Sequence, residues 1–195
     1  MLDWVADPDT KTPSIIMENV ENTDWRSVFE GEDFDLDSIK RYIYSILQGL
    51  DFAHQRGIIH RDIKPGNVLF LPEKKACKIV DWGLADIYEP GKRFNVRVAS
   101  RYFKGPELLV DNHFYDYQLD IWSTGCMMAG MIFQKEPFFK GADNDDQLIK
   151  IAKVVGTEEI IQYCKKFDGH TKLSAPIMEN LLNFKKKPWE KFINA

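Results

Sequence analysis

Apolar residues recur every three or four positions between Asp37 and His54, in the clearest periodic pattern of the chain. This spacing gathers apolar side chains on one face of an α-helix and leaves polar residues on the other face. Gly57 follows closely and is suited to ending the helix. We therefore expect an amphipathic helix over residues 37–54, whose buried face carries Ile39, Ile43, Ile46, Leu50 and Ala53.

Short apolar runs predict strands at two places. Ser14–Val20 is a run that suits a buried strand, and Asn22–Asp24 after it offers helix-cap chemistry. Val68–Leu71 and Cys77–Val80 flank a short polar turn, which is typical of a β-hairpin.

Two further segments predict helices. Asp120–Phe133 is apolar on nearly all sides, which is typical of a helix in the middle of a core. Asp145–Val155 has one apolar face, and Thr157 is placed to cap another helix after Gly156. Helices surround one small hairpin without strand–helix–strand alternation, so the pattern predicts a mainly α, single-domain chain.

Composition narrows the class of protein. The net charge of −4 gives no indication of a nucleic-acid partner. The most apolar stretch, residues 121–139, is interrupted by polar and charged residues and a proline, so we expect no membrane span. The three cysteines, Cys77, Cys126 and Cys164, lie far apart, so we expect no disulfide framework or zinc site and favour a reducing, intracellular location.

A polar loop with the sequence HRDIKPGN, residues 60–67, separates the first long helix from the hairpin. It contains a carboxylate (Asp62), an ammonium (Lys64) and an amide (Asn67), and Asp81 follows the return strand of the hairpin. Strand pairing would bring Asn67 close to Asp81, and amide and carboxylate oxygens are ligands that suit Mg²⁺. Asp62 could accept a hydroxyl proton while Lys64 neutralises phosphate charge. These are the groups that phosphoryl transfer requires.

The loop resembles the catalytic loop of protein kinases, and Asp81-Trp82-Gly83 resembles their metal-binding triplet with Trp in place of Phe. Gly105-Pro106-Glu107 stands where these kinases have Ala-Pro-Glu, and DIWSTG at 120–125 resembles the start of their central helix. The Trp of the triplet and the Gly before Pro106 resemble the casein kinase II catalytic subunit. Further stretches that carry this closer likeness are 95–109, 115–120, 131–139 and 143–157.

The resemblance implies a role for each residue of the loop. Asp62 would be the general base that orients a substrate Ser or Thr hydroxyl, Lys64 would contact the transferred phosphate, and Ser100 would bridge these two. Asn67 and Asp81 would hold Mg²⁺. The nucleotide would be ATP, with GTP as a second candidate, and the residues implied to contact it are Met17, Glu18, Val20, Leu69, Val80 and Asp81.

A basic cluster of Arg97, Arg101 and Lys104 precedes Gly105. Guanidinium groups bind carboxylates and phosphoserine in a forked geometry. The resemblance implies that this cluster reads acidic residues beyond the phospho-acceptor, so that the partners are acidic Ser/Thr protein substrates. Solvated surface charge is the alternative interpretation. Residues 81–107 contain no threonine, so phosphorylation there is not the expected switch.

Three parts of a kinase site are missing from the sequence: the glycine-rich loop, the strand lysine and the helix glutamate that pairs with that lysine. The resemblance thus implies a partial kinase domain of the α+β kinase fold, mainly α, with most of the small N-terminal lobe missing. Residues 1–22 would be a residual strand and hinge, and residues 23–195 the large C-terminal lobe, truncated before the arginine that pairs with Glu107. We expect the chain alone to bind ATP poorly and to phosphorylate slowly or not at all.

Three interpretations stay open. The first, a Ser/Thr kinase catalytic subunit seen as an incomplete chain, is favoured because the catalytic-loop and metal residues are all present. The second is a non-catalytic, kinase-derived binding module for acidic partners, and the third is a recent gene remnant. The resemblance also implies a regulatory subunit whose docking surface is largely absent here, no nucleic-acid or membrane partner, and residence in nucleus and cytoplasm.

Overall fold

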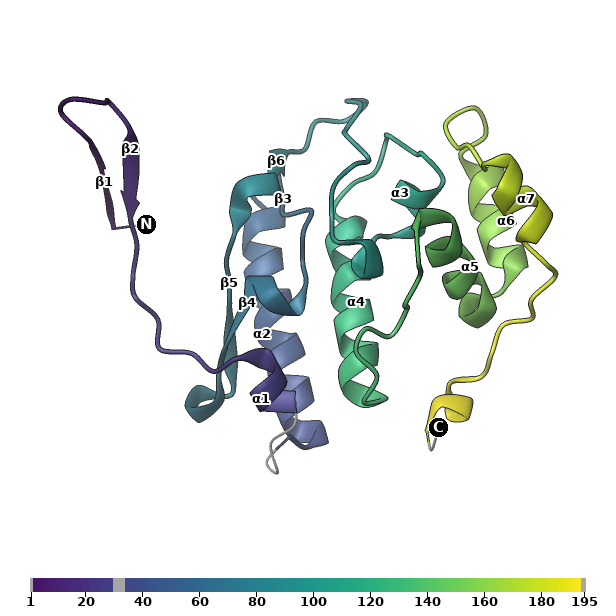
Figure 1. Ribbon diagram of the computed structural model, residues 1–195, viewed down its shortest axis with the longest axis horizontal. Coiled ribbons are helices and arrows are strands. Elements are labelled where there is room, and N and C mark those ends of the chain that lie inside the picture. Colours follow the sequence, from purple (N-terminus) through teal and green to yellow (C-terminus); the bar gives the residue numbers. More distant parts are fainter. Residues whose placement is uncertain (1, 30–33, 194–195) are drawn as a thin grey trace.

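The computed structural model describes residues 2–29 and 34–193, and its fold is mainly α, as the sequence predicts. Helices α2 (Leu36–His54) and α4 (Gln118–Ile132) lie side by side at the centre (Figure 1). On one side of this pair are α5 (Asn144–Val155), α6 (Thr157–Lys166) and α7 (Ala175–Asn180). The short helix α1 (Trp25–Phe29) precedes α2 in the chain, and the short helix α3 (Pro106–Leu109) precedes α4.

Helix α2 confirms the strongest sequence pattern. It begins one residue earlier than predicted because the Asp35 carboxylate caps it, accepting a hydrogen bond from Ser38 N at 2.8 Å. It ends ahead of Gly57, whose φ of 75° is the left-handed conformation expected of a helix stop. All five residues of the predicted apolar face are buried, and α2 packs against strand β5 (Ala76–Ile79) and helix α4.

The hairpin that follows the polar loop is also confirmed. Strands β4 (Val68–Leu71) and β5 (Ala76–Ile79) pair antiparallel, with Val68 opposite Ile79, and β5 lies one residue earlier than predicted. A second, unpredicted pair joins β3 (Ile58–Ile59) to β6 (Asp86–Ile87). This pair places the chain after Asp81-Trp82-Gly83 beside the end of α2.

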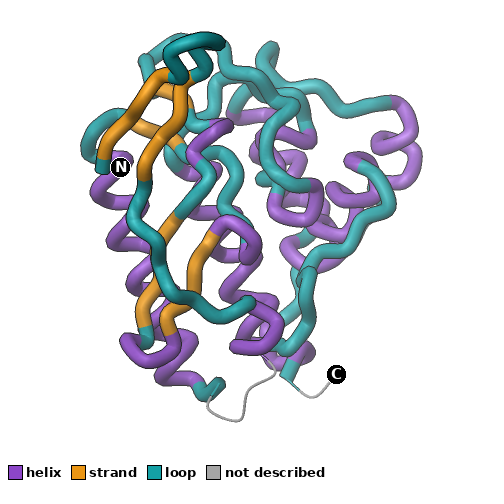
Figure 2. Tube along the Cα trace, turned by 60° about the vertical axis from the view of Figure 1, so that its left-hand side comes forward, coloured by secondary structure: helices purple, strands orange, loops and turns teal. Residues whose placement is uncertain are grey.

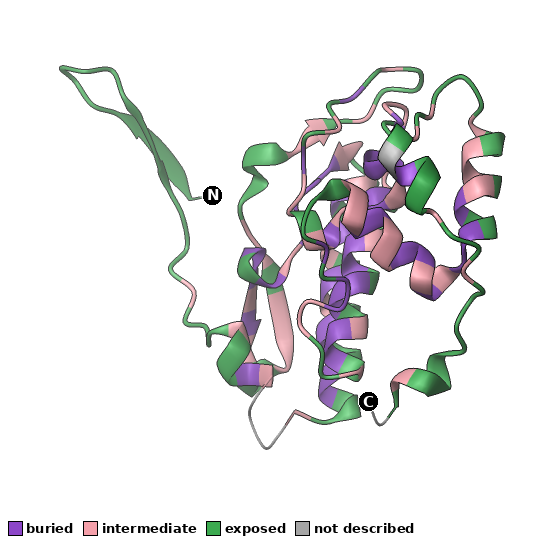
Figure 3. Ribbon diagram, turned by 45° about the vertical axis from the view of Figure 1, so that its right-hand side comes forward, coloured by how far each residue is buried: buried purple, intermediate pink, exposed green. Residues whose placement is uncertain are grey.

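The N-terminal strand corrects one prediction. Strand β2 (Pro13–Ile16) ends earlier than the predicted run 14–20, and it pairs with an unpredicted strand, β1 (Asp3–Ala6). Every residue of this hairpin is exposed rather than buried, and Figure 3 shows the hairpin projecting from the rest of the chain. Both hairpins lie on the same side of the helices (Figures 1 and 2). An apolar run can specify a strand, but burial needs a partner that packs against it.

Helix α4 corrects a second prediction, because it is not buried on all sides. Leu119 and Met127 are fully buried, whereas Ile121 and Met128 are 46% and 42% exposed. These exposed residues line a cavity of about 1220 Å³ between α4, the chain after α3, and α6. None of the residues of the 60–67 loop lines this cavity.

The start of α6 corrects a third prediction. Gly156, with a φ of 100°, precedes the helix, and Thr157 makes no side-chain capping hydrogen bond. The Thr157 hydroxyl instead donates to the carbonyl of Leu182 and accepts from Phe184 N. It therefore ties the C-terminal segment to α6.

Two predictions from composition can be compared with the structure. No helix in the described ranges is long and apolar enough to cross a membrane. The three cysteines are free thiols, and Cys126 is buried while Cys77 and Cys164 are partly buried. Burial raises the pKa of the Cys77 thiol to about 12, so this thiol stays protonated at neutral pH.

Candidate active site

The polar loop 60–67 is anchored by Asp120, a fully buried residue in the first turn of α4. The Asp120 carboxylate accepts hydrogen bonds from the backbone N–H groups of His60 and Arg61, each at 2.8 Å. It also lies 2.8 Å from Nε2 of His54, at the end of α2. Arg61 takes a φ of 68°, a conformation that a non-glycine residue holds only when its surroundings stabilise it. The two amide contacts supply that stabilisation.

The side chain of Asp62, next in the chain, is the centre of a cluster of four predicted residues. One carboxylate oxygen, Oδ2, accepts from Lys64 Nζ at 2.7 Å and from Asn67 Nδ2 at 3.0 Å. The other, Oδ1, accepts from the backbone N–H of Ser100 at 2.9 Å and from its hydroxyl at 3.1 Å. Lys64 Nζ also lies 3.0 Å from Ser100 Oγ. The fold thus brings Asp62, Lys64, Asn67 and Ser100 together.

Asp81 lies at the adjacent end of the hairpin. Val80 N donates to the carbonyl oxygen of Asn67 at 3.0 Å, so Asp81 directly follows the residue that pairs with Asn67. Asp81 is exposed and has a φ of 60°, and its Oδ1 accepts a long 3.4 Å hydrogen bond from Gly83 N. A β-carbon at Gly83 would stand 3.2 Å from that oxygen, a tight contact that a small shift of the exposed Asp81 side chain would relieve.

His60 supports this loop from inside the protein. Its Nδ1 accepts from Asp62 N at 3.2 Å, so the proton is on Nε2, which donates to the carbonyl of Val80 at 3.1 Å. Its ring meets the Trp82 ring edge to face at 4.6 Å. Burial lowers the pKa of His60, and the hydrogen bond to Val80 opposes this only in part. A neutral His60 therefore links the loop to the hairpin and to the triplet.

The family model of the protein kinase domain matches residues 1–192. The chain belongs to the protein kinase family. Protein kinases are transferases that generally use ATP and Mg²⁺, and the cluster around Asp62 is built from the side chains that such a transfer needs. The groups that meet there come from the 60–67 loop and from the distant Ser100, so the kinase site exists only in the folded chain.

The residues present fit a magnesium ion. The Asn67 side chain uses its Nδ2 group for the carbonyl and the carboxylate of Asp62, at 2.9 and 3.0 Å, which leaves its Oδ1 available as a hard ligand. The exposed Asp81 carboxylate would supply a second oxygen. Phosphate oxygens of the nucleotide would complete the coordination shell. When bound, the ion would offset phosphate charge.

The residues predicted to contact the nucleotide occupy two places. Leu69 and Val80 are partly buried on the β4–β5 hairpin. Met17 is 68% exposed, just beyond β2, and Glu18 forms an exposed ion pair of 2.6 Å with Lys78 of β5. Val20 is partly buried on the connecting chain, which Thr23 then joins to β4 through a bridge to Phe70.

The predicted basic cluster is divided by the fold. Arg97 and Arg101 are exposed, and the Arg101 guanidinium donates to the carbonyl oxygen of Ala142. Lys104 is partly buried, and its ammonium donates to the carbonyl oxygen of Val98 at 2.7 Å. Burial lowers the pKa of Lys104, while the charge of Asp62 opposes that shift. The two arginines are therefore the more accessible members.

Glu107 is buried, and the described residues offer it no ion pair. Burial raises its pKa to about 7, although a hydrogen bond from its own backbone opposes the shift. Its carboxyl group folds back over Gly105, so an alanine at that position would require the Glu107 carboxyl group to shift.

Sequence reasoning missed several residues that build the site. Asp120 belongs to the DIWSTG motif, but no local pattern indicates that it anchors the loop. His54 and Asp86 carry no local signal at all, because their partners Asp120 and Arg61 are distant in the sequence.

Proposed function

We propose that this chain is the catalytic part of a Ser/Thr protein kinase of the casein kinase II catalytic-subunit kind, which transfers the γ-phosphate of ATP to Ser or Thr in acidic contexts. The observation that carries the proposal is the Asp62 carboxylate, held by Lys64, Asn67 and Ser100. Its Oδ1 already accepts a hydroxyl hydrogen bond, from Ser100 at 3.1 Å. A substrate hydroxyl would be oriented in the same way.

Each group of the cluster has a distinct task in this proposal. Asp62 orients the attacking hydroxyl and accepts its proton, while Lys64 places positive charge where the transferred phosphate develops negative charge. Ser100 contacts both of these side chains and so holds them in position relative to each other. Asn67 and Asp81 hold Mg²⁺. Little covalent chemistry is left for the protein, so positioning accounts for most of its contribution.

The nucleotide is proposed to lie between the hairpin and the connecting chain. Residues 1–22 then correspond to a strand and hinge of the small lobe, and residues 23–195 to the large lobe. Leu69 and Val80 provide an apolar surface for the base, which can be adenine or guanine. Met17, Glu18 and Val20 border it from the connecting chain.

Acidic substrates are proposed to bind at Arg97, Arg101 and Lys104. Exposure of both guanidinium groups supports this, because each can form paired hydrogen bonds with a carboxylate. Lys104 is partly buried, so it contributes positive charge near Asp62 but is not free on the surface to bind a substrate carboxylate. Residence in nucleus and cytoplasm belongs to the same proposal and rests on the sequence resemblance, which implies a regulatory subunit only for the full-length family.

The test is phosphate transfer by the chain joined to a segment that supplies the glycine-rich loop, the strand lysine and the helix glutamate, because the chain alone is expected to transfer phosphate slowly or not at all. Matched peptides would present Ser, Thr or Tyr, each followed by either acidic or neutral residues, with Mg-ATP. We expect transfer to Ser and Thr with preference for acidic peptides, and Asp62→Asn should lower kcat by at least about 10²-fold. Transfer to Tyr alone, or equal activity of Asp62→Asn, would contradict the proposal.

Charge reversal tests the basic cluster separately. Replacing Arg97, Arg101 and Lys104 by Glu should raise KM for acidic peptides and leave neutral peptides nearly unchanged, because only the former present carboxylates. Equal loss on both peptides would remove the cluster from the proposal. Binding of acidic peptides without any phosphate transfer by the unaltered protein would favour a non-catalytic binding module instead.

A further inference from the structure

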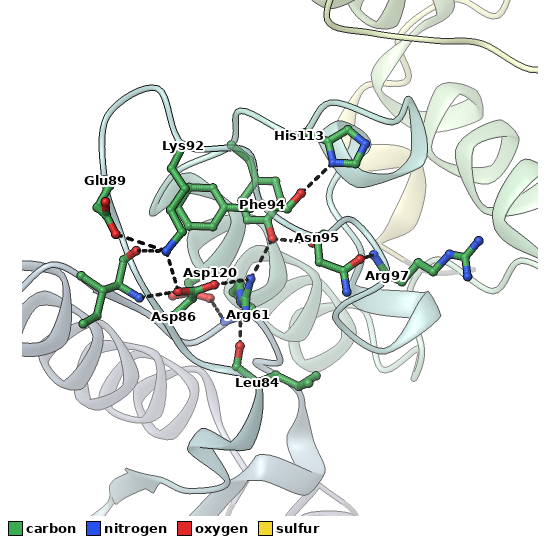
Figure 4. A network of polar contacts seen from close by, with 12 residues as sticks. Arg61, Leu84, Asp86, Glu89, Lys92, Phe94, Asn95, Arg97, His113 and Asp120 are labelled. Atoms are coloured by element: carbon green, nitrogen blue, oxygen red, sulfur yellow. Dashed lines mark hydrogen bonds and ion pairs between the residues drawn. The ribbon is translucent and has the colours of Figure 1, made fainter.

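We propose that His113 is a positioning residue for substrate selection, which holds the chain at Phe94 and thereby sets where Arg97 meets an acidic side chain of the substrate. The inference rests on the proposed function, since it names a further residue that determines how acidic substrates are bound. His113 contacts Phe94, three positions before Arg97, so its effect passes through the backbone between them. Figure 4 shows His113 at one end of this path and Arg97 at the other.

Both backbone groups of Phe94 are bonded to His113. Phe94 N donates to the carbonyl oxygen of His113 at 2.8 Å, and the carbonyl oxygen of Phe94 lies 2.7 Å from Nδ1 of the His113 ring. A carbonyl oxygen can only accept, so Nδ1 carries a proton and donates it. The Phe94 side chain is 3% exposed and belongs to a buried cluster with Leu108, Tyr115 and Leu119. Phe94 is therefore fixed by its side chain and by its backbone.

His113 itself stands on a well-anchored stretch between α3 and α4. Its neighbour Asn112 is 1% exposed, donates through Nδ2 to the hydroxyl of Tyr163 in α6 at 2.9 Å, and accepts through Oδ1 from Phe114 N at 2.9 Å. Nε2 of His113 lies 3.3 Å from Oδ1 of Asp111. The His113 ring thus reaches Phe94 from a backbone that is bonded to α6.

The path from Phe94 to Arg97 is short and hydrogen-bonded. The carbonyl oxygen of Asn95 accepts from the Tyr115 hydroxyl at 2.6 Å, and Oδ1 of Asn95 accepts from Arg97 N at 2.9 Å. An asparagine that bonds the backbone two residues ahead forms an Asx turn, which fixes the direction of the chain. The backbone position of Arg97 therefore follows from Phe94 and Asn95.

The two exposed arginines of the basic cluster are held in different ways. The Arg101 guanidinium donates to the carbonyl oxygen of Ala142, so this side chain is itself fixed. The Arg97 side chain has no hydrogen-bond or ion-pair partner among the described residues, so only its backbone sets where its guanidinium can reach. Loosening Phe94 would displace Arg97 and leave Arg101 in place. His113 thus acts on one of the two arginines.

The test is a double-mutant cycle on peptide binding by the chain as it stands. The probe is a fluorescent acidic peptide with Ala at the phospho-acceptor position, and the same peptide with neutral residues is the reference. We expect His113→Leu to raise Kd for the acidic peptide about fivefold and Arg97→Ala about tenfold, with Kd for the neutral peptide within about twofold. The two changes together should cost no more than Arg97→Ala alone, because the guanidinium that His113 positions is already gone. Combined with Arg101→Ala, the losses should multiply.

Two matched variants isolate the bond to Phe94. His113→Asn keeps a donor where Nδ1 stands and should recover most of the binding, and Asp111→Asn leaves that bond intact and should change Kd by less than about twofold. Multiplying losses in the His113–Arg97 cycle, or an equal loss in Asp111→Asn, would overturn the inference. If His113→Leu fails to fold, Asn95→Ala removes the acceptor of Arg97 N at an exposed position, and its loss must show the same dependence on Arg97.

Kinetics separate this inference from the proposed function. In the chain completed with the missing small-lobe parts, His113→Leu should raise KM for acidic peptides about fivefold while kcat stays within about twofold. If the unaltered completed chain transfers no phosphate, the function fails, and the binding cycle still decides the role of His113. Transfer that prefers acidic peptides, together with multiplying losses in the cycle, would overturn the inference alone. Equal binding of acidic and neutral peptides would overturn both the inference and the proposed acidic preference.

Discussion

Two regions of this kinase bury carboxyl groups in opposite ways. Asp62 and Asp120 each accept several hydrogen bonds from donors that point at them. Glu107 and Glu136 form no ion pair in the described ranges. Burial raises the pKa of each to about 7, and at Glu136 the charge of Arg26 opposes that shift. Glu136 Oε2 and Trp122 Nε1 are buried without a hydrogen-bond partner among the described residues.

The difference lies in the hydrogen-bond donors around each carboxyl group. Around Asp62, donors come from the same loop and from Ser100, so its carboxylate oxygens keep hydrogen-bond partners after leaving water. Around Glu107, which lines the apolar cavity with Trp122, comparable donors are missing from the described residues. A carboxyl group in such surroundings stays protonated, because burying its neutral form costs less free energy than burying its charged form. Substitutions in each of the two regions test this contrast.

Asp120→Asn should weaken the donor-rich region most. An asparagine amide would bring its own N–H₂ against one of the backbone N–H groups of His60 and Arg61, so one buried donor would lose its acceptor. We expect the free energy of unfolding to fall by about 3 kcal/mol, measured by urea denaturation. Asp143→Asn is the matched control, because Asp143 caps α5 through one exposed hydrogen bond and asparagine caps equally well. Similar small losses in both variants would show that Asp120 is not an anchor.

The two faces of α4 should respond differently to truncation. Met127 is fully buried, whereas Met128 is 42% exposed and lines the cavity. Met127→Ala should cost about 2–4 kcal/mol of unfolding free energy, and Met128→Ala less than about 1 kcal/mol, because only the first leaves a void in packed surroundings. Thermal or urea unfolding of both variants measures this, and equal costs would mean that the cavity face is as well packed as the core face.

Glu107→Gln should stabilise the protein at neutral and higher pH. Below about pH 4.5 the glutamate is protonated in both the folded and the unfolded state. Between that value and about 7, the folded state holds a proton that the unfolded state has lost, so stability falls as pH rises through this window. Glutamine stays neutral throughout, and we expect it to add about 1–3 kcal/mol at pH 8 and little at pH 4.5.

The measurement is the difference in unfolding free energy between variant and parent at several pH values. A difference is needed because Glu136 contributes a slope of the same sign, and the lowered pKa of His60 contributes the opposite one. Glu136→Gln in the Glu107→Gln background should remove most of the remaining fall with rising pH. A stability difference that does not depend on pH would show that Glu107 is ionised in the folded protein.

The elements that sequence predicted well are those in which neighbouring residues contain the whole cause. Helix α2 follows from the spacing of its apolar residues, and the β4–β5 hairpin follows from two apolar runs around a turn. The kinase motifs were recognisable for the same reason, since Asp62, Lys64 and Asn67 lie within six positions. Their approach to Ser100 was given only by resemblance, because no local pattern joins residues so far apart.

Sequence alone thus determined the mainly α character, the principal helix and hairpin, and the types of side chain that form the kinase loop. The tertiary structure decided that β1 and β2 are exposed, that α4 faces a cavity, and that Thr157 contacts the C-terminal segment rather than capping α6. It also decided that Arg61 joins Asp86 to the Asp62 loop. Periodicity and capping are local properties of the backbone, whereas burial and ion pairing depend on which distant segments the fold brings into contact.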